Sequence, residues 1–594
     1  MPSSAPPRLG HVIVCGLEGV GFRVVEQLHL SGTEVVVIDD DSHPSLARAL
    51  EGWGVTHLRR SAFLGDVLAA ADLDGAIAVV CSEADEIRTL ETALRIRELR
   101  DDVRLVVQLS NPSVAKALQR ATPGGSVLDV AAIAAPSFVE VCLRSTSHEI
   151  DLDGTRFEVA EALVEAAGPS GATFRRIFGD LAPVAVMPIG TGEMIQCPGR
   201  DHRLADGDRV AVLGTPDELR AAGIDPDLRT PAPRRAVPLA RRLGRRLSTL
   251  WEEGNRSLLL LVVALLGLML VSTLVVATWL RPNVGHGHIG LLSAAYFTIE
   301  TVATVGYGDF SFARQGPTML IFGMVLIVLS VILVSAAFAL FTNILVTGRI
   351  ERSLGRREVT GMAGHVVVVG LGSVGIAVVR DLVAQGSRVV VVDNDPANRY
   401  LDQARSLGVP VIIADATQSE THRMVHLRDA SAVAVLTSED LTNIDVGLAV
   451  RESLGARADD LPIALRIFDH DLARMMGSSF GFAHVRSTAA IAAPWFVGAA
   501  LGLDVLSTFY VEQEPFLVGR VRVAPDGGLR GLSMADLSAR VRVFALRGAG
   551  DDGELEHPPR RETRFAPGDE AFLIGPYEEL VGILQRDRRP PASP

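Results

Sequence analysis

The six residues TVGYGD, Thr304 to Asp309, lie between two long apolar segments and decide the fold of the central part of the chain. Before them, Ser257 to Leu280 is a run of 24 residues without a charge, and after them Gln315 to Gly348 is a run of 34. The shorter run would extend about 36 Å as a helix, which is enough to cross a bilayer. The sequence therefore predicts two membrane spans, with a short helix and a glycine-containing turn between them.

The distribution of arginine predicts the orientation of these spans. Arginines are frequent before the first span, at 234–246, and after the second, at 349–357, whereas the loop between the spans has only Arg281 and Arg314. Positively charged flanks stay on the cytoplasmic side of a membrane. We therefore expect a multi-pass protein of the cell (inner) membrane, with both termini and both soluble regions in the cytoplasm.

The composition fits a small membrane domain within larger soluble regions. Of 594 residues, 48% are hydrophobic, and the mean hydropathy is +0.29. This value is too high for an ordinary soluble enzyme and too low for a protein that is mostly membrane. The net charge of −13 argues against a nucleic-acid partner. None of the four cysteines has CxxC spacing, so they indicate buried thiols and not a zinc site.

The order of span, short helix, TVGYG and second span resembles the pore of potassium channels. The resemblance implies that backbone carbonyls and the Thr304 hydroxyl replace the hydration shell of K⁺, the permeant ion. Glycine permits the unusual φ values that such a row of carbonyls needs. One chain would supply a quarter of the ring, so the resemblance implies a homotetramer in the lipid bilayer. The expected selectivity filter is Thr304, Val305, Gly306, Tyr307 and Gly308.

Two acidic residues flank this expected filter. Glu300 lies in the predicted short helix, nine residues before Asp309. A carboxylate at this depth is costly unless it is paired or protonated. By resemblance to potassium channels with acidic residues at these places, Glu300 and Asp309 are expected to support the filter by sharing a proton or a water molecule. The alternative is two solvated carboxylates at the pore mouth.

The soluble regions on either side of the pore repeat each other. HVIVCGLEGVG at 11–21 matches HVVVVGLGSVG at 365–375, and AAIAAPSFV at 131–139 matches AAIAAPWFV at 489–497. In both copies, 23 residues separate the first glycine of the turn from the aspartate that ends the next apolar strand. Valine-rich strands that alternate with helices predict a doubly wound parallel sheet in each copy.

These two copies, the N-terminal arm (11–222) and the C-terminal arm (365–588), resemble RCK domains, which regulate potassium conductance. The fold class expected is mixed: a two-span α-helical potassium-channel pore flanked by two α/β Rossmann-like RCK domains, each with a small α+β C-terminal lobe. Before the pore, we expect a flexible tail (1–10), a Rossmann-like lobe (11–145), a C-lobe (146–222) and a basic linker or interfacial helix (223–256). The expected pore domain is 257–346, with spans at 257–280 and 317–346 and the pore helix and filter at 289–309. After it, we expect a linker (347–364), a second Rossmann-like lobe (365–505) and a second C-lobe (506–588).

The C-terminal arm carries the complete dinucleotide-binding pattern. Strand, glycine turn, helix and strand-end acid together predict a pyrophosphate at a helix N-terminus and a ribose at the acid. The expected ligand is NAD(H) or an adenine nucleotide, although such lobes also occur with an empty site. The residues that match the pattern are Gly370, Gly372, Gly375, Asp393 and Asp415, and the resemblance adds Ser438, Glu439 and Asn443 as pocket lining.

The N-terminal arm carries an altered pattern. Gly16, Gly21 and Asp39 are kept, but Glu18 replaces the glycine that would face the pyrophosphate, and Ser61 takes the place of Asp415. A carboxylate opposes phosphate by bulk and by charge. We expect this arm to bind a nucleotide weakly, or to bind a nucleoside or a cation instead.

Together these features predict a tetrameric potassium-selective channel gated by a cytoplasmic nucleotide, and not an enzyme. The alternative is a Ca²⁺-gated channel of the same architecture, for which aspartates at 39–41, 72 and 74 supply oxygens. A membrane-tethered NAD-dependent oxidoreductase is less favoured because the sequence shows neither a positioned base nor a second substrate domain.

Overall fold

The computed structural model describes residues 10–40, 44–63, 65–122, 125–144, 147–152, 154–165, 171–190, 194–225, 255–280, 289–354, 362–468, 470–512, 514–537, 540–550, 555–560 and 562–588. Residues 1–9 of the predicted tail, and 226–254 and 355–361 of the two predicted linkers, lie outside the described residues. The chain divides into two compact units, a pore unit (233–357) and a soluble unit (1–232 with 358–594).

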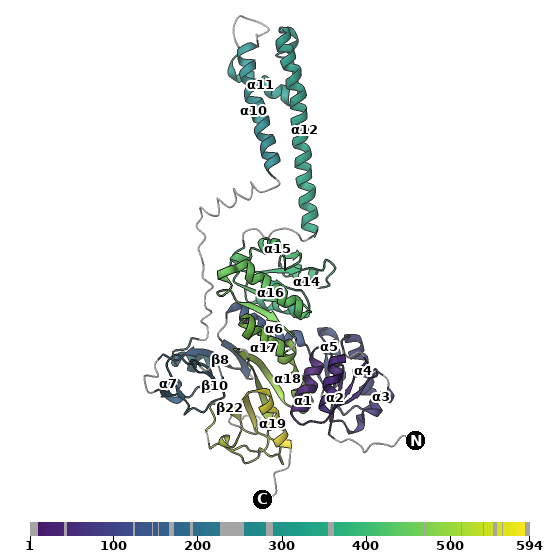
Figure 1. Cartoon of the computed structure of the whole chain (residues 1–594), viewed down its shortest axis with the longest axis vertical. Coiled ribbons are helices and arrows are strands. Elements are labelled where there is room, and N and C mark those ends of the chain that lie inside the picture. The colour runs from purple at the N-terminus through teal and green to yellow at the C-terminus, as the bar shows by residue number, and fades with distance from the viewer. Residues whose placement is uncertain are drawn as a thin grey trace. The chain divides into compact units, whose positions relative to one another are not determined.

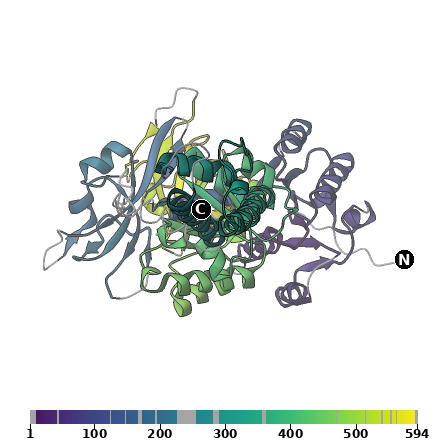
Figure 2. The ribbon, with the colours of Figure 1, turned by 90° about the horizontal axis from the view of Figure 1, so that it is seen from above.

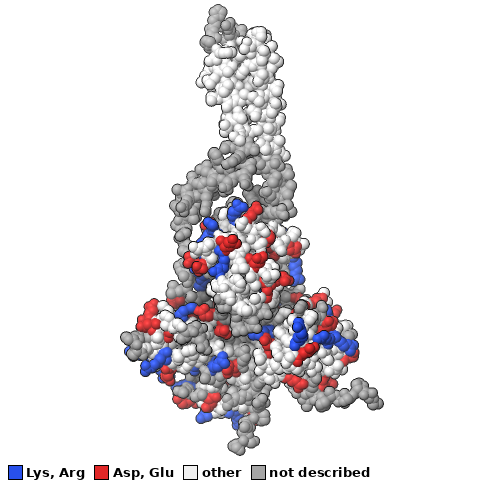
Figure 3. Space-filling view, viewed as in Figure 1, with Lys and Arg blue, Asp and Glu red and all other residues white. Residues whose placement is uncertain are grey.

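The described residues of the pore unit form three α-helices, α10 (Asn255–Trp279), α11 (Leu291–Val302) and α12 (Pro317–Leu354), and a short 3-10 helix, Phe312–Arg314. Leu260–Trp279 and Pro317–Leu340 are both long and apolar enough to cross a membrane. Figure 3 shows this unit almost free of charged side chains on the visible face, whereas red and blue side chains are scattered over the soluble unit. Helix α12 runs to Leu354 and thus includes eight residues that the sequence analysis assigned to the second linker.

An apolar cluster joins the three helices near the glycine turn. Phe297 of α11 packs against Phe312, with ring centroids 4.9 Å apart, and Phe312 packs against Phe322 of α12 at 6.2 Å. A Cβ at Gly323 would lie 2.7 Å from the Phe312 ring, so the glycine makes room for that ring. The single glycine in this part of α12 therefore serves packing.

Each arm contains a six-stranded parallel sheet covered by helices (Figure 1). Continuous runs such as Val366–Val369 are buried on both faces, as a doubly wound sheet requires. In the N-terminal arm the strand order is β3-β2-β1-β4-β5-β6, and in the C-terminal arm it is β16-β15-β14-β17-β18-β19. The predicted fold class is confirmed.

The sheet strands of the N-terminal arm are β1 (Val12–Cys15), β2 (Val35–Ile38), β3 (Thr56–Leu58), β4 (Ala78–Cys81), β5 (Arg104–Gln108) and β6 (Ser126–Leu128). Its helices are α1 (Val20–Leu30), α2 (Pro44–Trp53), α3 (Gly65–Ala70), α4 (Glu86–Leu99), α5 (Pro112–Ala121) and α6 (Val130–Leu143). The corresponding strands of the C-terminal arm are β14 (Val366–Val369), β15 (Val389–Asp393), β16 (Val411–Ile413), β17 (Ala432–Val435), β18 (Ile463–Arg466) and β19 (His484–Arg486). Its helices are α13 (Ser373–Ala384), α14 (Leu401–Ser406), α15 (Ser419–Met424), α16 (Asp440–Leu454), α17 (His470–Phe480) and α18 (Thr488–Leu501).

A five-stranded antiparallel sheet forms each C-lobe, in the orders β11-β10-β13-β8-β7 and β20-β21-β24-β22-β23. The first sheet comprises β7 (Ser147–Leu152), β8 (Thr155–Leu163), β10 (Ala182–Met187), β11 (Ile195–Gln196) and β13 (Arg209–Gly214). The second comprises β20 (Asp504–Val511), β21 (Glu514–Arg522), β22 (Arg542–Arg547), β23 (Leu555–Glu556) and β24 (Glu570–Gly575). Helices α7 (Phe174–Phe178), α8 (Pro216–Ala221) and α19 (Tyr577–Arg588) and the strand pair β9 (Ala172–Thr173) and β12 (Arg203–Leu204) complete the C-lobes.

The two arms exchange their sixth helices. Helix α6 of the N-terminal arm packs against α13 and the sheet of the C-terminal arm, and α18 packs against α1 and the sheet of the N-terminal arm. Phe138 and Phe496, the central aromatic residues of these helices, are fully buried. The C-lobes also share a core, in which the Phe157 and Phe544 rings lie 5.5 Å apart. Figure 2 shows the strands of the two C-lobes side by side. The arms therefore form one folded body.

Candidate functional site

The glycine turn of the pore unit follows directly after α11. Thr304, Gly306 and Gly308 have φ values of 57°, 64° and 87°, so every second residue is in the left-handed region. The sequence analysis expected the two glycines to take such values but did not identify Thr304. The turn begins with a hydrogen bond from the Val305 amide to the Glu300 carbonyl, 3.0 Å long.

The carboxylate of Glu300 supports this turn from behind. Its side chain is 5% exposed, and its Oε1 accepts a hydrogen bond from the amide of Tyr307. The alternative of a solvated Glu300 at the pore mouth is therefore wrong. Its Oε2 is buried and has no hydrogen-bond partner among the described residues. Asp309 is exposed, and the predicted sharing of a proton or a water between Glu300 and Asp309 stays a prediction.

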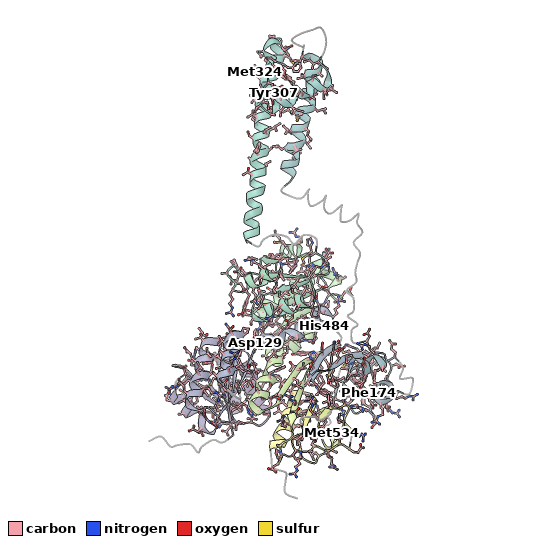
Figure 4. All side chains as sticks on the ribbon, turned by 180° about the vertical axis from the view of Figure 1, so that it is seen from behind. Asp129, Phe174, Tyr307, Met324, His484 and Met534 are labelled. Atoms are coloured by element: carbon pink, nitrogen blue, oxygen red, sulfur yellow. The ribbon has the colours of Figure 1, made fainter. Side chains whose placement is uncertain are left out.

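Large apolar side chains of the turn face outward from the single chain. Val305 is 50% exposed and Tyr307 is 71% exposed. Figure 4 shows Tyr307 at the same end of the pore unit as Met324 of α12. Because the residues that the structure describes leave both side chains at least half exposed, the turn resembles one part of a larger assembly more than a finished surface.

The glycine turn of the C-terminal arm lies directly before the N-terminus of α13. Gly370 has a φ of 90°, and a Cβ there would lie 2.8 Å from the Thr437 amide nitrogen. A Cβ at Gly375 would lie 2.1 Å from the Gly370 carbonyl oxygen. By contrast, Gly372, at the N-cap of α13, has no atom within 4 Å of its Cβ position. Two glycines therefore close the turn, and the third leaves open space before a helix N-terminus, where an anion is stabilised.

Asp393 holds the glycine turn in place. Its carboxylate accepts hydrogen bonds from the Leu371 amide (2.7 Å), the Asp395 amide (2.9 Å) and Asn398 Nδ2 (3.2 Å). Asn398 also donates to the Leu371 carbonyl, 3.1 Å away, and is a site residue that the sequence analysis missed. Asp393 is only 7% exposed, so any bond to a ribose would add to bonds within the protein.

The remaining predicted residues of this site divide into two groups. Asp415, Ser438 and Glu439 are exposed at the carboxyl edge of the sheet. Hydrogen bonds from Thr417 lower the pKa of Asp415, so its carboxylate is charged. Asn443, expected as pocket lining, is instead fully buried. It accepts from the Thr437 amide at 2.9 Å and donates to the Thr437 and Arg466 carbonyls, so it fixes the segment after β17.

The N-terminal arm keeps the turn but differs at the edge where a ligand would lie. Gly16 and Gly21 make the same close approaches, since Cβ atoms there would lie 2.6 Å from Glu83 Cα and 2.2 Å from the Gly16 carbonyl oxygen. Glu18 is exposed. Asp39 accepts from the Leu17 amide at 3.4 Å, a longer bond than that of Asp393 to Leu371.

Arg88 of α4 spans the carboxyl ends of β2 and β4 in this arm. Its Nη2 lies 2.8 Å from both carboxylate oxygens of Asp40 and 3.9 Å from Glu83. Burial raises the pKa of Glu83, and Arg88 counteracts this effect. The sequence analysis missed Arg88.

The strand pairing also confirms that Ser61 takes the place of Asp415. Ile38 pairs with Leu58 in the N-terminal arm, as Val392 pairs with Ile412 in the C-terminal arm. Ser61 and Asp415 each follow three residues after Leu58 and Ile412.

A pair of apolar spans with a re-entrant helix and turn, joined to two Rossmann-like arms, defines a membrane channel protein with attached regulatory domains. Comparison with known families agrees: residues 258–347 match the ion channel family, and residues 12–124 and 366–487 each match the TrkA-N domain family. The chain is thus a two-span channel protein with a TrkA-N domain on either side of the pore, and the predicted family is confirmed.

Individual relatives are distant. An uncharacterized protein of Methanothermus fervidus is 25% identical over 174 residues, which are 28% of this chain and 26% of that protein. The probable potassium channel protein 2 of Methanocaldococcus jannaschii is 22% identical over 343 residues, 54% of this chain and 94% of that protein. Among solved structures, the GsuK channel is 16% identical to this chain, and its TM-score is 0.49. The match covers 99% of this chain and 80% of the GsuK chain. The GsuK channel bound to NAD has the same coverage and identity and a TM-score of 0.47.

Proposed function

We propose that four copies of this chain form a potassium-selective channel. The observation that carries the proposal is the turn at 304–308, which has left-handed φ values at every second residue and is held from behind by Glu300. Such a backbone suits a row of inward carbonyls that replaces the hydration shell of a cation. The exposed Val305 and Tyr307 side chains would be covered by neighbouring copies around the pore axis.

The proposed gating ligand is NAD(H) or an adenine nucleotide, bound at the glycine turn of the C-terminal arm from the cytoplasm. The open space at Gly372 and the charged Asp415 support a pyrophosphate and hydroxyl groups there. In the N-terminal arm, the exposed carboxylate of Glu18 opposes the same ligand. A ligand shifts the channel only through different affinities for its open and closed forms. The alternative of Ca²⁺ as gate or co-ligand is less favoured because Asp40 already pairs with Arg88.

The test is flux of K⁺ through purified protein in liposomes, with and without each of NAD⁺, NADH, ATP and ADP. We expect K⁺ flux that changes with one of these ligands and is lost in Gly306→Ala, because a Cβ at a φ of 64° distorts the turn. Gly316→Ala is the matched control, since that glycine lies outside the turn and has open space at its Cβ. Flux in Gly306→Ala equal to that of the wild type would contradict the proposal, and nucleotide-independent flux would contradict only its gating part.

A further inference from the structure

A cavity of about 500 Å³ lies within the soluble unit where the two arms meet. Its wall combines α6, β8 and β13 of the N-terminal arm with β19 and β20 of the C-terminal arm. Its volume is typical of sites for small molecules. The residues described around it include none from either glycine turn, so it is distinct from the nucleotide site proposed above.

Arg486, at the end of β19, brings a buried charge to this cavity. Its side chain is 6% exposed, and its Nη1 donates to the carbonyls of Val485 (3.2 Å) and Glu512 (3.1 Å). Its guanidinium stacks 4.3 Å from the ring centroid of Tyr510. The Nε is buried without a hydrogen-bond partner in the described part of the chain, and the charges of Glu140, Glu512 and Glu161 act on the guanidinium without a salt bridge to it there. A buried guanidinium is costly unless it is paired and fully hydrogen-bonded.

Arg144, at the C-cap of α6, is a second arginine in the same wall and is half-buried. Its φ of 55° lies in the left-handed region, which favours glycine. Its Nη2 donates to the Asp460 carbonyl, and its Nε is buried without a partner among the residues described. Burial, and then the charges of Arg486 and Arg144, lower the pKa of the neighbouring His484 to about 4. Figure 4 labels His484 within the soluble unit.

The internal repeat shows that the fold does not require these arginines. Leu128 in the N-terminal arm corresponds to Arg486 in the C-terminal arm. Leu128 pairs with Gln108 on the neighbouring strand, and Arg486 pairs in the same way with Arg466. The helices that follow align Arg144 with Gly502, which has a φ of 79°. In the N-terminal arm, Leu128 therefore ends the strand that Arg486 ends in the C-terminal arm. In the C-terminal arm, Gly502 ends the helix that Arg144 ends in the N-terminal arm. A function other than folding is the simplest reason for two arginines at these positions.

Carboxylates around the cavity already have other partners or face solvent. Arg209 pairs with Glu161 (2.7 Å) and with Glu512, and His148 pairs with Glu140. Asp459 and Asp460 are exposed. In the described part of the chain, the hydrogen bonds of Arg144 and Arg486 go only to backbone carbonyls, so the charge of both guanidinium groups remains for a ligand.

The geometry points to a binding site for a small phosphate-bearing molecule in this cavity, with Arg486 and Arg144 holding the phosphate. Guanidinium groups suit phosphate because their planar N–H donors match two oxygens at once. Since the wall comes from both arms, a ligand here would bridge the N-terminal arm to the C-terminal arm.

Calorimetry on the full-length protein in detergent, with inorganic phosphate as the probe against chloride at matched ionic strength, tests the site. We expect phosphate-specific binding that weakens at least about tenfold in Arg486→Leu and in Arg144→Gly. Arg144→Gly restores the residue found at 502 and removes a left-handed arginine, so its thermal unfolding midpoint should equal or exceed that of the wild type. Arg520→Leu, which changes a β21 arginine that bonds to Asp504 away from the cavity, should bind as the wild type does.

Two results would overturn the site. One is the absence of phosphate-specific binding to the wild type. The other is unchanged phosphate affinity in Arg144→Gly, which would place any bound phosphate elsewhere, for example at the glycine turn of the C-terminal arm. Should Arg486→Leu fail to fold, Arg144→Gly alone decides between the two outcomes.

Discussion

Replacement of Asp393 by alanine should separate the two arms as ligand sites. In the structure this carboxylate accepts three hydrogen bonds, from the Leu371 amide, the Asp395 amide and Asn398. The variant loses these bonds and also the proposed bonds to ribose. Hydrogen bonds to a charged group contribute about 1.5–3 kcal/mol, so nucleotide affinity should fall roughly 10- to 150-fold.

A second effect of this replacement is structural. The buried Leu371 amide loses its acceptor, which should lower the free energy of unfolding by about 1–3 kcal/mol. Asp393→Asn separates the two effects, because it keeps one acceptor oxygen while it removes the charge. Thermal unfolding and calorimetry with NAD⁺, NADH, ATP and ADP should therefore be measured on the same samples.

The matched control is Asp39→Ala in the N-terminal arm, which should leave nucleotide affinity nearly unchanged. Full-length protein is needed, because isolated arms would lack the exchanged helices α6 and α18. Equal losses in the two variants, or a greater loss in Asp39→Ala, would refute the assignment of the nucleotide to the C-terminal arm.

Three further changes test other parts of the structure. Glu300→Ala removes the acceptor of the Tyr307 amide and should change filter inactivation and its dependence on outer pH in current recordings; identical gating from pH 4 to 8 would count against this support. Phe496→Ala should destabilise the soluble unit by about 3–5 kcal/mol and, in hydrogen exchange, loosen the sheet of the N-terminal arm, although the residue belongs to the other arm; protection lost only in the C-terminal arm would disprove the helix exchange. Glu218 bonds to His557, which holds the pKa of Glu218 at about 2, below its ordinary 4.5. The stabilising effect is therefore present above pH 4.5 and lost as the pH falls toward 2, so Glu218→Gln should lower the thermal midpoint at pH 7 but not at pH 2, and an equal decrease at both would exclude this linkage.

The sequence was sufficient to predict the strand-rich arms and the pore helices because their patterns are local. Val366–Val369 and Val389–Asp393 are buried on both faces and can fit only the interior of a parallel sheet. Likewise, the uncharged run that became α10 can lie only in an apolar environment. The difference between Glu18 and Gly372 was visible directly, since the repeat aligns the two turns.

The exchange of helices could not be read from the sequence. AAIAAPSFV and AAIAAPWFV are apolar on nearly every side, so they predict burial but not which of two similar sheets covers them. Arg88 and Asn398 were missed for a related reason. Each acts on a partner from another element, and the register that brings them together depends on tertiary packing.

The most direct test of the central claim is the reversal potential of wild-type protein in a planar bilayer, with K⁺ on one side and Na⁺ on the other. At equal concentrations of the two ions, a carbonyl-lined turn at 304–308 predicts a reversal potential far from zero, with the K⁺ side negative, because K⁺ leaves that side and Na⁺ passes poorly. A reversal potential near zero, with Na⁺ passing as readily as K⁺, would contradict the account.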